Sequence, residues 1–288
     1  MPEPDPTCSR VIVISGGTDG MGRALALARA GRGDTVVALG SNLDKGRRLL
    51  ADADKSSVAG RVEFIRVDLS SVGQTRAAIG EIIARHDVID ALVLFANRQA
   101  PERTTTAEGF EQTFALYYLS RYILGYGLLS LLRRSEAGVI VNVAGVGMVK
   151  GKIHWDDLQL ENDYGMVAAQ LQAGRANDLL GVAFAEQPDN PVRYVLYHPG
   201  FTRSGDLSPL PAVLRASLSV AARLAARPIA ESIAPIHEFI DTPPSAPLTA
   251  IDRGKPVPLT LRTLDPANAR HLAEATSSLL ETVDRARP

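Results

Sequence analysis

Short apolar runs alternate with longer segments of helical periodicity along most of the chain. Runs that are apolar throughout are typical of strands covered on both faces, as in a parallel sheet. Six such runs fit strands, namely Val11–Ser15, Thr35–Leu39, Val62–Val67, Ala91–Ala96, Val139–Val143 and Arg193–Tyr197. The segments between them predict the helices Gly22–Arg32, Leu43–Ala53, Val72–Arg85, Glu108–Arg134 and Met166–Glu186. Helical crossovers of this length predict an α/β fold with a doubly wound parallel sheet.

The pattern changes after Gly200. Residues 201–210 are polar with prolines, and residues 211–226 are rich in Ala and Leu and predict a helix. Five prolines between Pro243 and Pro258 indicate a loop-rich stretch, and Ala267–Val283 predicts a final helix. We interpret residues 201–260 as a C-terminal lid and loop region over the substrate end of the sheet. A plain surface excursion is the alternative interpretation.

Length and composition favour one domain. The chain has 288 residues, of which 45% are hydrophobic, and this suffices for one large core. We expect a flexible N-terminal arm over residues 1–9 and the folded domain over residues 10–288. The first residues lack the apolar core of a signal peptide, and the apolar stretch Tyr122–Leu132 is too short to span a bilayer. The sequence therefore predicts a cytoplasmic protein that does not bind membranes.

Charge and cysteine content exclude other classes of partner. The net charge is −1 and no basic stripe stands out, so nucleic acid is not an expected partner. The single cysteine, Cys8, has no partner for an internal disulfide, and no spacing of Cys and His fits a metal site. We expect a small-molecule substrate and no metal.

A glycine-rich turn follows the first apolar run. It reads Ser15-Gly16-Gly17-Thr18-Asp19-Gly20-Met21-Gly22 and leads into a helical segment. A strand, a glycine turn and a helix in this order form a cradle for a phosphate. Glycine lets the backbone approach the ligand, and the helix N-terminus offers free N–H groups and a positive dipole end. The turn therefore predicts nucleotide binding, with a plain tight turn as the alternative.

Several motifs together resemble the short-chain dehydrogenase/reductase family, on its retinol-dehydrogenase-like branch. The turn resembles the family's cofactor turn, Val67-Asp68-Leu69-Ser70 its Asp-Leu pair, and His198-Pro199-Gly200 its Pro-Gly step beside the nicotinamide. Further matches are Gly109-Phe110-Glu111, Leu119-Ser120-Arg121 and His154-Trp155-Asp156-Asp157-Leu158. The resemblance covers nearly the whole chain. It implies a single-domain Rossmann-like fold that binds NAD(P)(H) and forms a homo-oligomer.

The cofactor-binding residues implied by this resemblance lie at the ends of successive strands. They are Ser15, Gly16, Thr18, Asp19, Gly20, Met21, Gly22, Ser41, Asn42, Asp68, Leu69, Ala96, Pro199 and Gly200. Arg203 and Ser204 are further candidates for a cofactor contact. Sites that prefer NAD usually carry an acid after the second strand, and here Leu39-Gly40-Ser41-Asn42 has none. The sequence therefore favours NADP(H) over NAD(H).

The family's catalytic residues are replaced. In the register of the resemblance, Gln170 stands at the tyrosine position and Gly174 at the lysine position. Gly145 stands at the serine position and Tyr117 at the asparagine position. No other Tyr-x-x-x-Lys occurs in the chain. The missing lysine removes the cation that would make a phenol acidic near neutral pH.

The candidate catalytic residues are therefore Tyr117 and Gln170. Tyr117 can project into the site as a hydrogen-bond donor or acid, with ordinary packing as the alternative. Arg121, one turn on, either lowers the pKa of Tyr117 or has a structural role. The small residues Gly145 and Gly174 imply vacated volume, with neutral drift in an inactive protein as the alternative.

Three functions follow from a kept cofactor turn and lost proton-transfer residues. The first is an enzyme that catalyses a non-hydride transformation, such as cyclisation, isomerisation or dehydration, of a small molecule, in the manner of tailoring enzymes of secondary metabolism. The second is an atypical NADPH-dependent carbonyl reductase with Tyr117 as acid. The third is a non-catalytic protein that senses the dinucleotide and regulates a partner. The first is the leading hypothesis.

Overall fold

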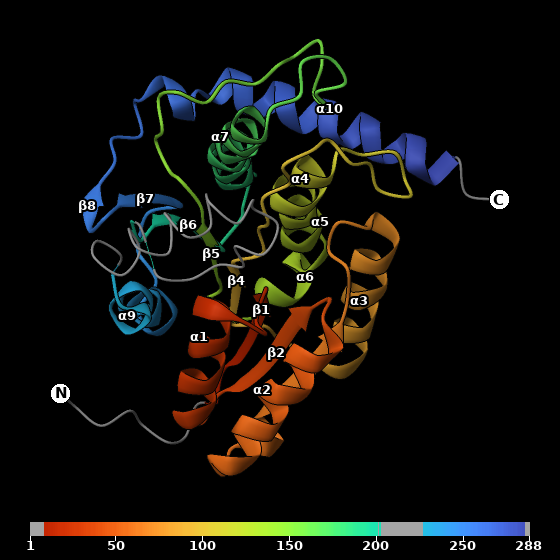
Figure 1. Ribbon diagram of the computed structural model, residues 1–288. Helices are drawn as coiled ribbons and strands as arrows, with labels where there is room; N and C mark the ends of the chain where they lie inside the picture. The colour runs from red at the N-terminus through yellow and green to blue at the C-terminus, as the bar shows by residue number, and fades with distance from the viewer. Residues whose placement is uncertain (1–8, 201, 203–226, 286–288) are drawn as a thin grey trace.

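The computed structural model describes residues 9–200, 202 and 227–285. One eight-stranded sheet runs through it in the order β3-β2-β1-β4-β5-β6-β7-β8 (Figure 1). All neighbouring strands pair in parallel except β7 and β8. The strands are β1 (Val11–Ser15), β2 (Thr35–Gly40), β3 (Val62–Arg66), β4 (Ala91–Leu94), β5 (Val139–Val143), β6 (Arg193–His198), β7 (Leu248–Asp252) and β8 (Lys255–Pro256). This is the doubly wound Rossmann-like sheet that the apolar runs predict.

Helices cover both faces of the sheet. On one face lie α1 (Gly20–Gly31), α2 (Leu43–Lys55) and α9 (Ile229–Asp241), which share one apolar core with that side of the strands. On the other lie α3 (Val72–Arg85), α5 (Ser120–Gly127), α6 (Leu129–Leu132), α7 (Met166–Ala185) and α10 (Pro266–Arg285), whose apolar residues form a second core (Figure 1). Short helical segments are α4 (Gln112–Phe114) and the 3₁₀ turns η1 (Ala59–Arg61) and η3 (Arg262–Leu264).

Side-chain caps fix where several helices begin. Asp19 accepts a hydrogen bond from the Gly20 backbone N–H at 2.8 Å and caps α1. Asn42 caps α2 in the same way through the Lys45 N–H, and Ser71 caps α3 through the Gln74 N–H. Such caps satisfy donors that have no partner within the helix. The Asp19 cap fixes the start of α1 at Gly20, just after the end of β1 at Ser15.

One predicted helix, Glu108–Arg134, is broken in the structure. It begins only at Gln112 and passes through a π-helical segment, η2 (Ala115–Leu119), before α5. A π segment places one extra residue in the turn and is frequent at functional sites. It carries Tyr117, so the break changes where that side chain points.

The prediction of a loop-rich stretch near the C-terminus is wrong in part. Strand β7 joins the sheet beside β6, and helix α9 packs on α1. The prolines misled the sequence reading, because Pro247 immediately precedes β7 and Pro256 belongs to β8. Residues 229–256 therefore contribute to the main layers. Residues 201 and 203–226 of the predicted lid, which include the predicted helix of residues 211–226 and the cofactor candidates Arg203 and Ser204, lie outside the described residues. So do residues 1–8 of the predicted arm.

The C-terminal helix α10 lies across α7. Four of its apolar residues are buried, namely Ala269, Leu272, Leu280 and Val283. Its Thr276 hydroxyl lies 2.7 Å from the Tyr118 hydroxyl of η2. Helix α10 therefore covers part of the surface of α7 and η2. The homo-oligomer stays a prediction.

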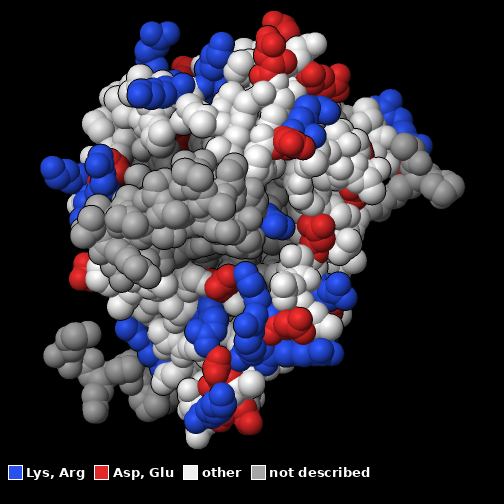
Figure 2. Space-filling model, viewed as in Figure 1, with Lys and Arg blue, Asp and Glu red and all other residues white. Residues whose placement is uncertain are grey.

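No helix in the described part of the chain is long and apolar enough to cross a membrane. The same residues contain no group of three or more His, Cys, Asp or Glu side chains that could hold a metal ion. Basic and acidic side chains intermingle over the face shown in Figure 2. This mixture agrees with the near-zero net charge.

Candidate functional site

The glycine turn has the geometry that a bound phosphate requires. Gly16 and Gly20 adopt φ values of +71° and +51°, in the left-handed region that favours glycine. At Gly22 an added Cβ would lie 2.3 Å from the Gly16 carbonyl oxygen, so no larger residue fits there. The turn lies at the carboxyl ends of β1 and β4, where the strand order reverses. Open sheets bind ligands at such a point.

Other predicted cofactor residues shape this turn rather than project from it. The Ser15 hydroxyl accepts a hydrogen bond from the Ala96 backbone N–H at 3.3 Å and so joins β1 to the end of β4. Thr18 packs against Gly40, where a Cβ would lie 2.6 Å from the threonine hydroxyl oxygen. Leu69 is buried. The residues present therefore fit a dinucleotide, with the glycines as the contact surface.

A smaller cavity adjoins the ends of β2 and β3. It is lined by Ser41, Arg66, Asp68 and Gln74. The Arg66 Nε donates to the Ser41 carbonyl oxygen at 3.3 Å, so the guanidinium lies at the residue where the family's cofactor preference is set. The Asn42 side chain, by contrast, is committed to capping α2. Sequence reasoning missed Arg66, although its place at the end of a strand was a usable signal.

A larger cavity of about 610 Å³ lies beside the glycine turn. All four residues that the motif register assigns to the family's catalytic positions line it, and so do Met21, Pro199 and Gly200 of the predicted cofactor set. These four residues are Tyr117, Gly145, Gln170 and Gly174. The structure therefore brings the predicted catalytic residues together with three of the predicted cofactor residues.

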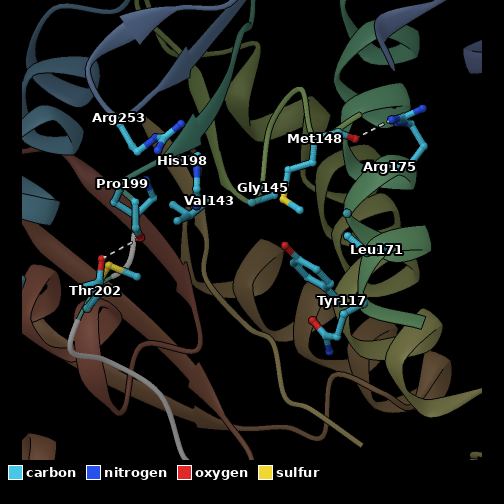
Figure 3. A pocket seen from close by; sticks show the side chains of 15 residues that line it. Tyr117, Val143, Gly145, Met148, Leu171, Arg175, His198, Pro199, Thr202 and Arg253 are labelled. Carbon is cyan, nitrogen blue, oxygen red and sulfur yellow. Dashed lines mark hydrogen bonds between the residues drawn. The ribbon is translucent and has the colours of Figure 1, made fainter. Parts of the chain in front are cut away.

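Tyr117 reaches this cavity from η2. Figure 3 shows its hydroxyl directed toward Gly145 and Met148. Burial raises the pKa of Tyr117, while the Arg121 charge and the Gly145 backbone N–H oppose that rise and the Asp178 charge adds to it. The phenol is therefore a weaker acid than free tyrosine, opposite to the effect of the family's lysine.

Arg121 holds the framework beneath the cavity. Its guanidinium is fully buried and donates to the Ala96 carbonyl at 3.0 Å, the Val143 carbonyl at 2.9 Å and the Asn142 side chain. It also lies over the Tyr117 ring, 4.7 Å from the centroid. Burial lowers the pKa of Arg121 to about 10, so it stays charged at neutral pH. The structural role that the sequence left open is confirmed by these contacts.

Gln170 lines the cavity, but its amide is already engaged. Its oxygen accepts from the Asn97 side chain at 3.0 Å, and its Nε2 donates to the Arg98 carbonyl at 3.1 Å. The residue thus ties α7 to the loop after β4. Its contact with a substrate stays a prediction, and Tyr117 is the better candidate for that role.

Two of the four residues, Gly174 and Gly145, have no side chain, and their surroundings differ. A Cβ added at Gly174 would meet nothing within 4 Å. At Gly145 a Cβ would lie 2.9 Å from the Met148 sulfur, the end of a flexible side chain. The vacated volume that the sequence predicts is therefore open at Gly174 and partly filled by Met148 at Gly145.

The charged residues that line the described part of the cavity are paired. Arg175 Nη2 donates to the Met148 carbonyl at 2.7 Å. On the opposite side lie His198 and Arg253 (Figure 3). The Asp252 carboxylate contacts both, 2.7 Å from His198 Nδ1 and 2.8 Å from Arg253 Nη2. Although burial opposes its ionisation, hydrogen bonds from Arg253 and His198 lower the pKa of Asp252. None of the described lining residues is a lysine.

Residues 10–156 match the family model for short chain dehydrogenases. The chain belongs to that family. Polyprenol dehydrogenase of Homo sapiens is 28% identical over 60% of this chain and 52% of its own length. Retinol dehydrogenase 13 of Mus musculus is 27% identical over 68% of this chain and 59% of its own length. Retinol dehydrogenase 12 of Homo sapiens is 29% identical over 68% of this chain and 62% of its own length. The match thus spans only half to about three fifths of these relatives.

Solved structures show the same fold. A protein from Mycobacterium Paratuberculosis superposes with a TM-score of 0.70 at 22% identity, over 94% of this chain and 93% of its own. A short chain dehydrogenase from Escherichia coli CFT073 complexed with NADPH gives a TM-score of 0.64 at 19% identity, over 88% of this chain and all of its own. The resemblance inferred from the motifs is confirmed for family and fold.

Proposed function

We propose that this member of the short chain dehydrogenase family binds a nicotinamide dinucleotide on the Gly16–Gly22 turn and catalyses a non-hydride transformation of a small molecule. The reaction class is an isomerisation, cyclisation or dehydration. The observation that carries this proposal is the cavity beside the turn, where Gly174 leaves open space and no described lining residue is a lysine. A bound dinucleotide supplies hydride chemistry when a proton donor of matched acidity accompanies it.

The chain's own groups fit proton and hydrogen-bond chemistry better than carbonyl reduction. Tyr117 has a raised pKa, because burial outweighs the nearby Arg121 charge. A phenol of that kind orients a substrate oxygen well and gives up its proton poorly. Val143, Leu171 and Met148 give the cavity an apolar stretch of wall beside that contact. Positioning and hydrogen bonding are the resulting sources of rate acceleration.

We further propose that the dinucleotide is NADP(H). Arg66 and Ser41 line one cavity at the carboxyl ends of β2 and β3, together with Asp68 and Gln74. Neither of the two residues directly after β2, Ser41 and Asn42, is an acid. An arginine that recognises a 2′-phosphate typically replaces the acid that binds a free ribose. The neighbours of this fold that were solved with NADP or NADPH support the same choice.

The binding half of the proposal is tested by thermal-shift titration with the four nicotinamide dinucleotides. Binding to the native state raises the melting temperature by linkage. For the parent protein we expect NADP⁺ or NADPH to raise the melting temperature most. In Arg66→Gln the rise with NADP⁺ and NADPH should be smaller, whereas the rise with NAD⁺ should stay the same. The absence of any shift with all four would contradict dinucleotide binding. Equal shifts with NAD⁺ and NADP⁺ would contradict only the preference.

The reaction half is tested by following nicotinamide absorbance and product mass together, with candidate carbonyl and polyene substrates. We expect a product isomeric with the substrate, or lighter by water, with no net change in absorbance. Consumption of one NADPH for each product molecule would instead establish the second candidate, an atypical carbonyl reductase. That candidate is favoured by one observation, the Tyr117 hydroxyl directed into the cavity. It predicts that Tyr117→Phe loses turnover.

A further inference from the structure

A histidine and an aspartate pair at the ends of two neighbouring strands, and the proposed function uses neither. His198 ends β6 and Asp252 ends β7, and the register of the sheet sets the two residues directly opposite each other. Opposed residues in adjacent strands project from the same face of a sheet. The His198 Nδ1 lies 2.7 Å from the Asp252 Oδ1, and both side chains are partly buried.

Arg253 holds the same carboxylate from a second side. Its Nε donates to the Asp252 Oδ1 at 3.1 Å and its Nη2 donates to Oδ2 at 2.8 Å. The Arg253 backbone N–H also donates to the His198 carbonyl oxygen at 2.8 Å, so the three residues form one cluster. Asp252 is ionised at neutral pH, because these side-chain hydrogen bonds outweigh burial and lower its pKa. An ionised carboxylate only accepts hydrogen bonds.

The pairing decides which nitrogen of His198 carries the proton. Because Asp252 only accepts, the hydrogen bond between them requires a proton on the His198 Nδ1. A neutral imidazole protonated at Nδ1 has its lone pair on Nε2. Among the described residues, Nε2 of His198 has no hydrogen-bond partner and is not one of the buried unpaired polar atoms. Its lone pair is therefore accessible to a ligand.

His198 lines the same cavity as Tyr117. The histidine reaches it from β6 and the tyrosine from η2. Figure 3 shows the two residues on different sides of the cavity, with Gly145 between them in this view. The cavity of about 610 Å³ is within the size range of pockets that bind small molecules. A ligand in it can therefore meet a basic nitrogen from one side and a hydroxyl group from the other.

We propose that His198 is a catalytic base and acid of this cavity, whose Nε2 takes a proton from a carbon next to a carbonyl group of the substrate. Asp252 fixes the tautomer of the ring and is a positioning residue. The Tyr117 hydroxyl donates a hydrogen bond to the carbonyl oxygen of the substrate. This inference rests on the proposed function and names its substrate class, a ketone or aldehyde with a C–H bond beside the carbonyl.

The step balances without an oxidant or a reductant. As Nε2 of His198 removes the proton, the electron pair of the broken C–H bond forms a C=C bond, and the carbonyl group becomes an enolate that the Tyr117 hydroxyl stabilises. The Asp252 carboxylate stabilises the imidazolium that results. In a β,γ-unsaturated ketone, His198 then returns the proton to the γ carbon and the double bond moves into conjugation. The protein groups end in their starting states.

The tautomer is tested by NMR of the full chain with ¹⁵N-labelled histidine. We expect the neutral His198 ring to carry its proton on Nδ1, and His198→Gln to assign its signals by removing them. Asp252→Asn should shift the population toward the form protonated at Nε2, because an amide can also donate to Nδ1. A parent protein with the proton on Nε2 would overturn the proposal, since the substrate would then meet no lone pair.

The proton transfer is tested by deuterium uptake from D₂O into cyclohexanone and by conversion of cyclohex-3-en-1-one to its conjugated isomer, with and without NADP⁺. NADP⁺ carries no hydride, so reduction cannot contribute. We expect the parent to catalyse both, and His198→Gln to lower kcat about 100-fold with little change in KM. Asp252→Asn should lower kcat at least about tenfold. A parent that catalyses neither reaction would overturn the proposal.

His86→Gln is the matched control. His86 also lies beside a carboxylate, with its Nε2 3.3 Å from Glu63, but it is not among the described residues that line the cavity. Its substitution should leave both rates unchanged. Rates that survive in His198→Gln would refute the inference, and equal losses in His86→Gln would show that the effect is not specific to the cavity and would refute it too.

These readouts separate the inference from the proposed function. The tautomer and the proton transfer are measured without a reduced dinucleotide, whereas the thermal-shift titration reports dinucleotide binding alone. His198→Gln should keep the thermal shift of the parent, which also shows that the variant is folded. A parent with no dinucleotide shift but with proton transfer that depends on His198 would refute only the proposed dinucleotide binding. A dinucleotide shift with proton transfer that is indifferent to His198 would refute only the inference.

Discussion

The two sides of the site use glycine for opposite reasons. On the β1 side, a Cβ at Gly22 would lie 2.3 Å from the Gly16 carbonyl oxygen, so the backbone itself requires glycine. On the α7 side, a Cβ at Gly174 would meet nothing within 4 Å. The first glycine preserves a tight turn that a phosphate can approach, whereas the second leaves a space. The glycine turn and the open space on α7 are therefore under separate packing constraints in this chain.

Substitution of Arg121, whose guanidinium contacts both sides of the site, should have the largest effect on stability. Arg121→Met removes the guanidinium that joins the Ala96 carbonyl of one side to the Val143 carbonyl of the other. Two buried carbonyls and the Asn142 side chain would lose their donor, and we expect a loss of about 3 kcal/mol in the free energy of unfolding. Urea denaturation measures it. A loss below about 1 kcal/mol would show that the two sides are held together by other contacts.

Substitution of Gly22, which has no room for a side chain, should have the next largest effect on stability. Gly22→Ala forces a Cβ into the Gly16 backbone, and we expect a loss of about 2 kcal/mol together with loss of the dinucleotide thermal shift. Gly31→Ala is the matched control, because it lies in the same helix and its Cβ would meet nothing within 4 Å. If Gly22→Ala keeps full dinucleotide binding, the turn is not the phosphate site.

The Asp178 carboxyl, whose pKa is raised by burial, should make the α7 side sensitive to pH. Its folded pKa of about 7 lies above the value near 4 of an unfolded aspartate, so its contribution is fully favourable at low pH and is lost as pH rises through 7. Asp178→Asn should therefore stabilise the protein, relative to the parent, by about 1 to 2 kcal/mol more at pH 8.5 than at pH 5.5. Denaturation at both pH values measures this difference, and equal effects at the two would argue against a raised pKa.

Substitution of Gly174, which lies beside open space, should have the smallest effect on stability. Gly174→Ala adds a methyl group in free space and restricts the unfolded chain, so we expect a gain of about 1 kcal/mol. Gly181→Ala in the same helix is the control, since its Cβ would lie 3.1 Å from Leu196 and Tyr194 and should bring no gain. Thermal unfolding of both variants measures the contrast. A loss of stability in Gly174→Ala would mean that the space is filled.

The sequence predicted the parts of the fold that repeat a strong local pattern. The bounds of β1, β5 and α3 agree with the structure at both ends, because apolar runs and the Ser71 cap define them. It missed α9 and β7, where prolines hide elements that tertiary packing stabilises. The π segment was also missed, since no local signal distinguishes an extra residue in a turn from a regular helix.

The candidate site was predicted unevenly. Register with a family motif assigned Tyr117, Gly145, Gln170 and Gly174 to the family's catalytic positions, and the structure places all four around one cavity. The same reasoning did not foresee that the Gln170 amide is engaged by the loop after β4. It also passed over Asp252, because that residue belongs to the missed strand β7. Hydrogen-bond partners and burial depend on segments distant in sequence, so no local pattern carries them.

A crystal structure of the full chain with bound NADP(H) tests the central claim most directly. The account predicts the pyrophosphate on the Gly16–Gly22 turn, with the nicotinamide ring beside the open space at Gly174 and no lysine amine within hydrogen-bond distance of the ring, its ribose or the Tyr117 hydroxyl. An amine of Lys150 or Lys152 folded into the cavity against Tyr117 would contradict it. That arrangement would restore the acidic phenol and make this chain a carbonyl reductase.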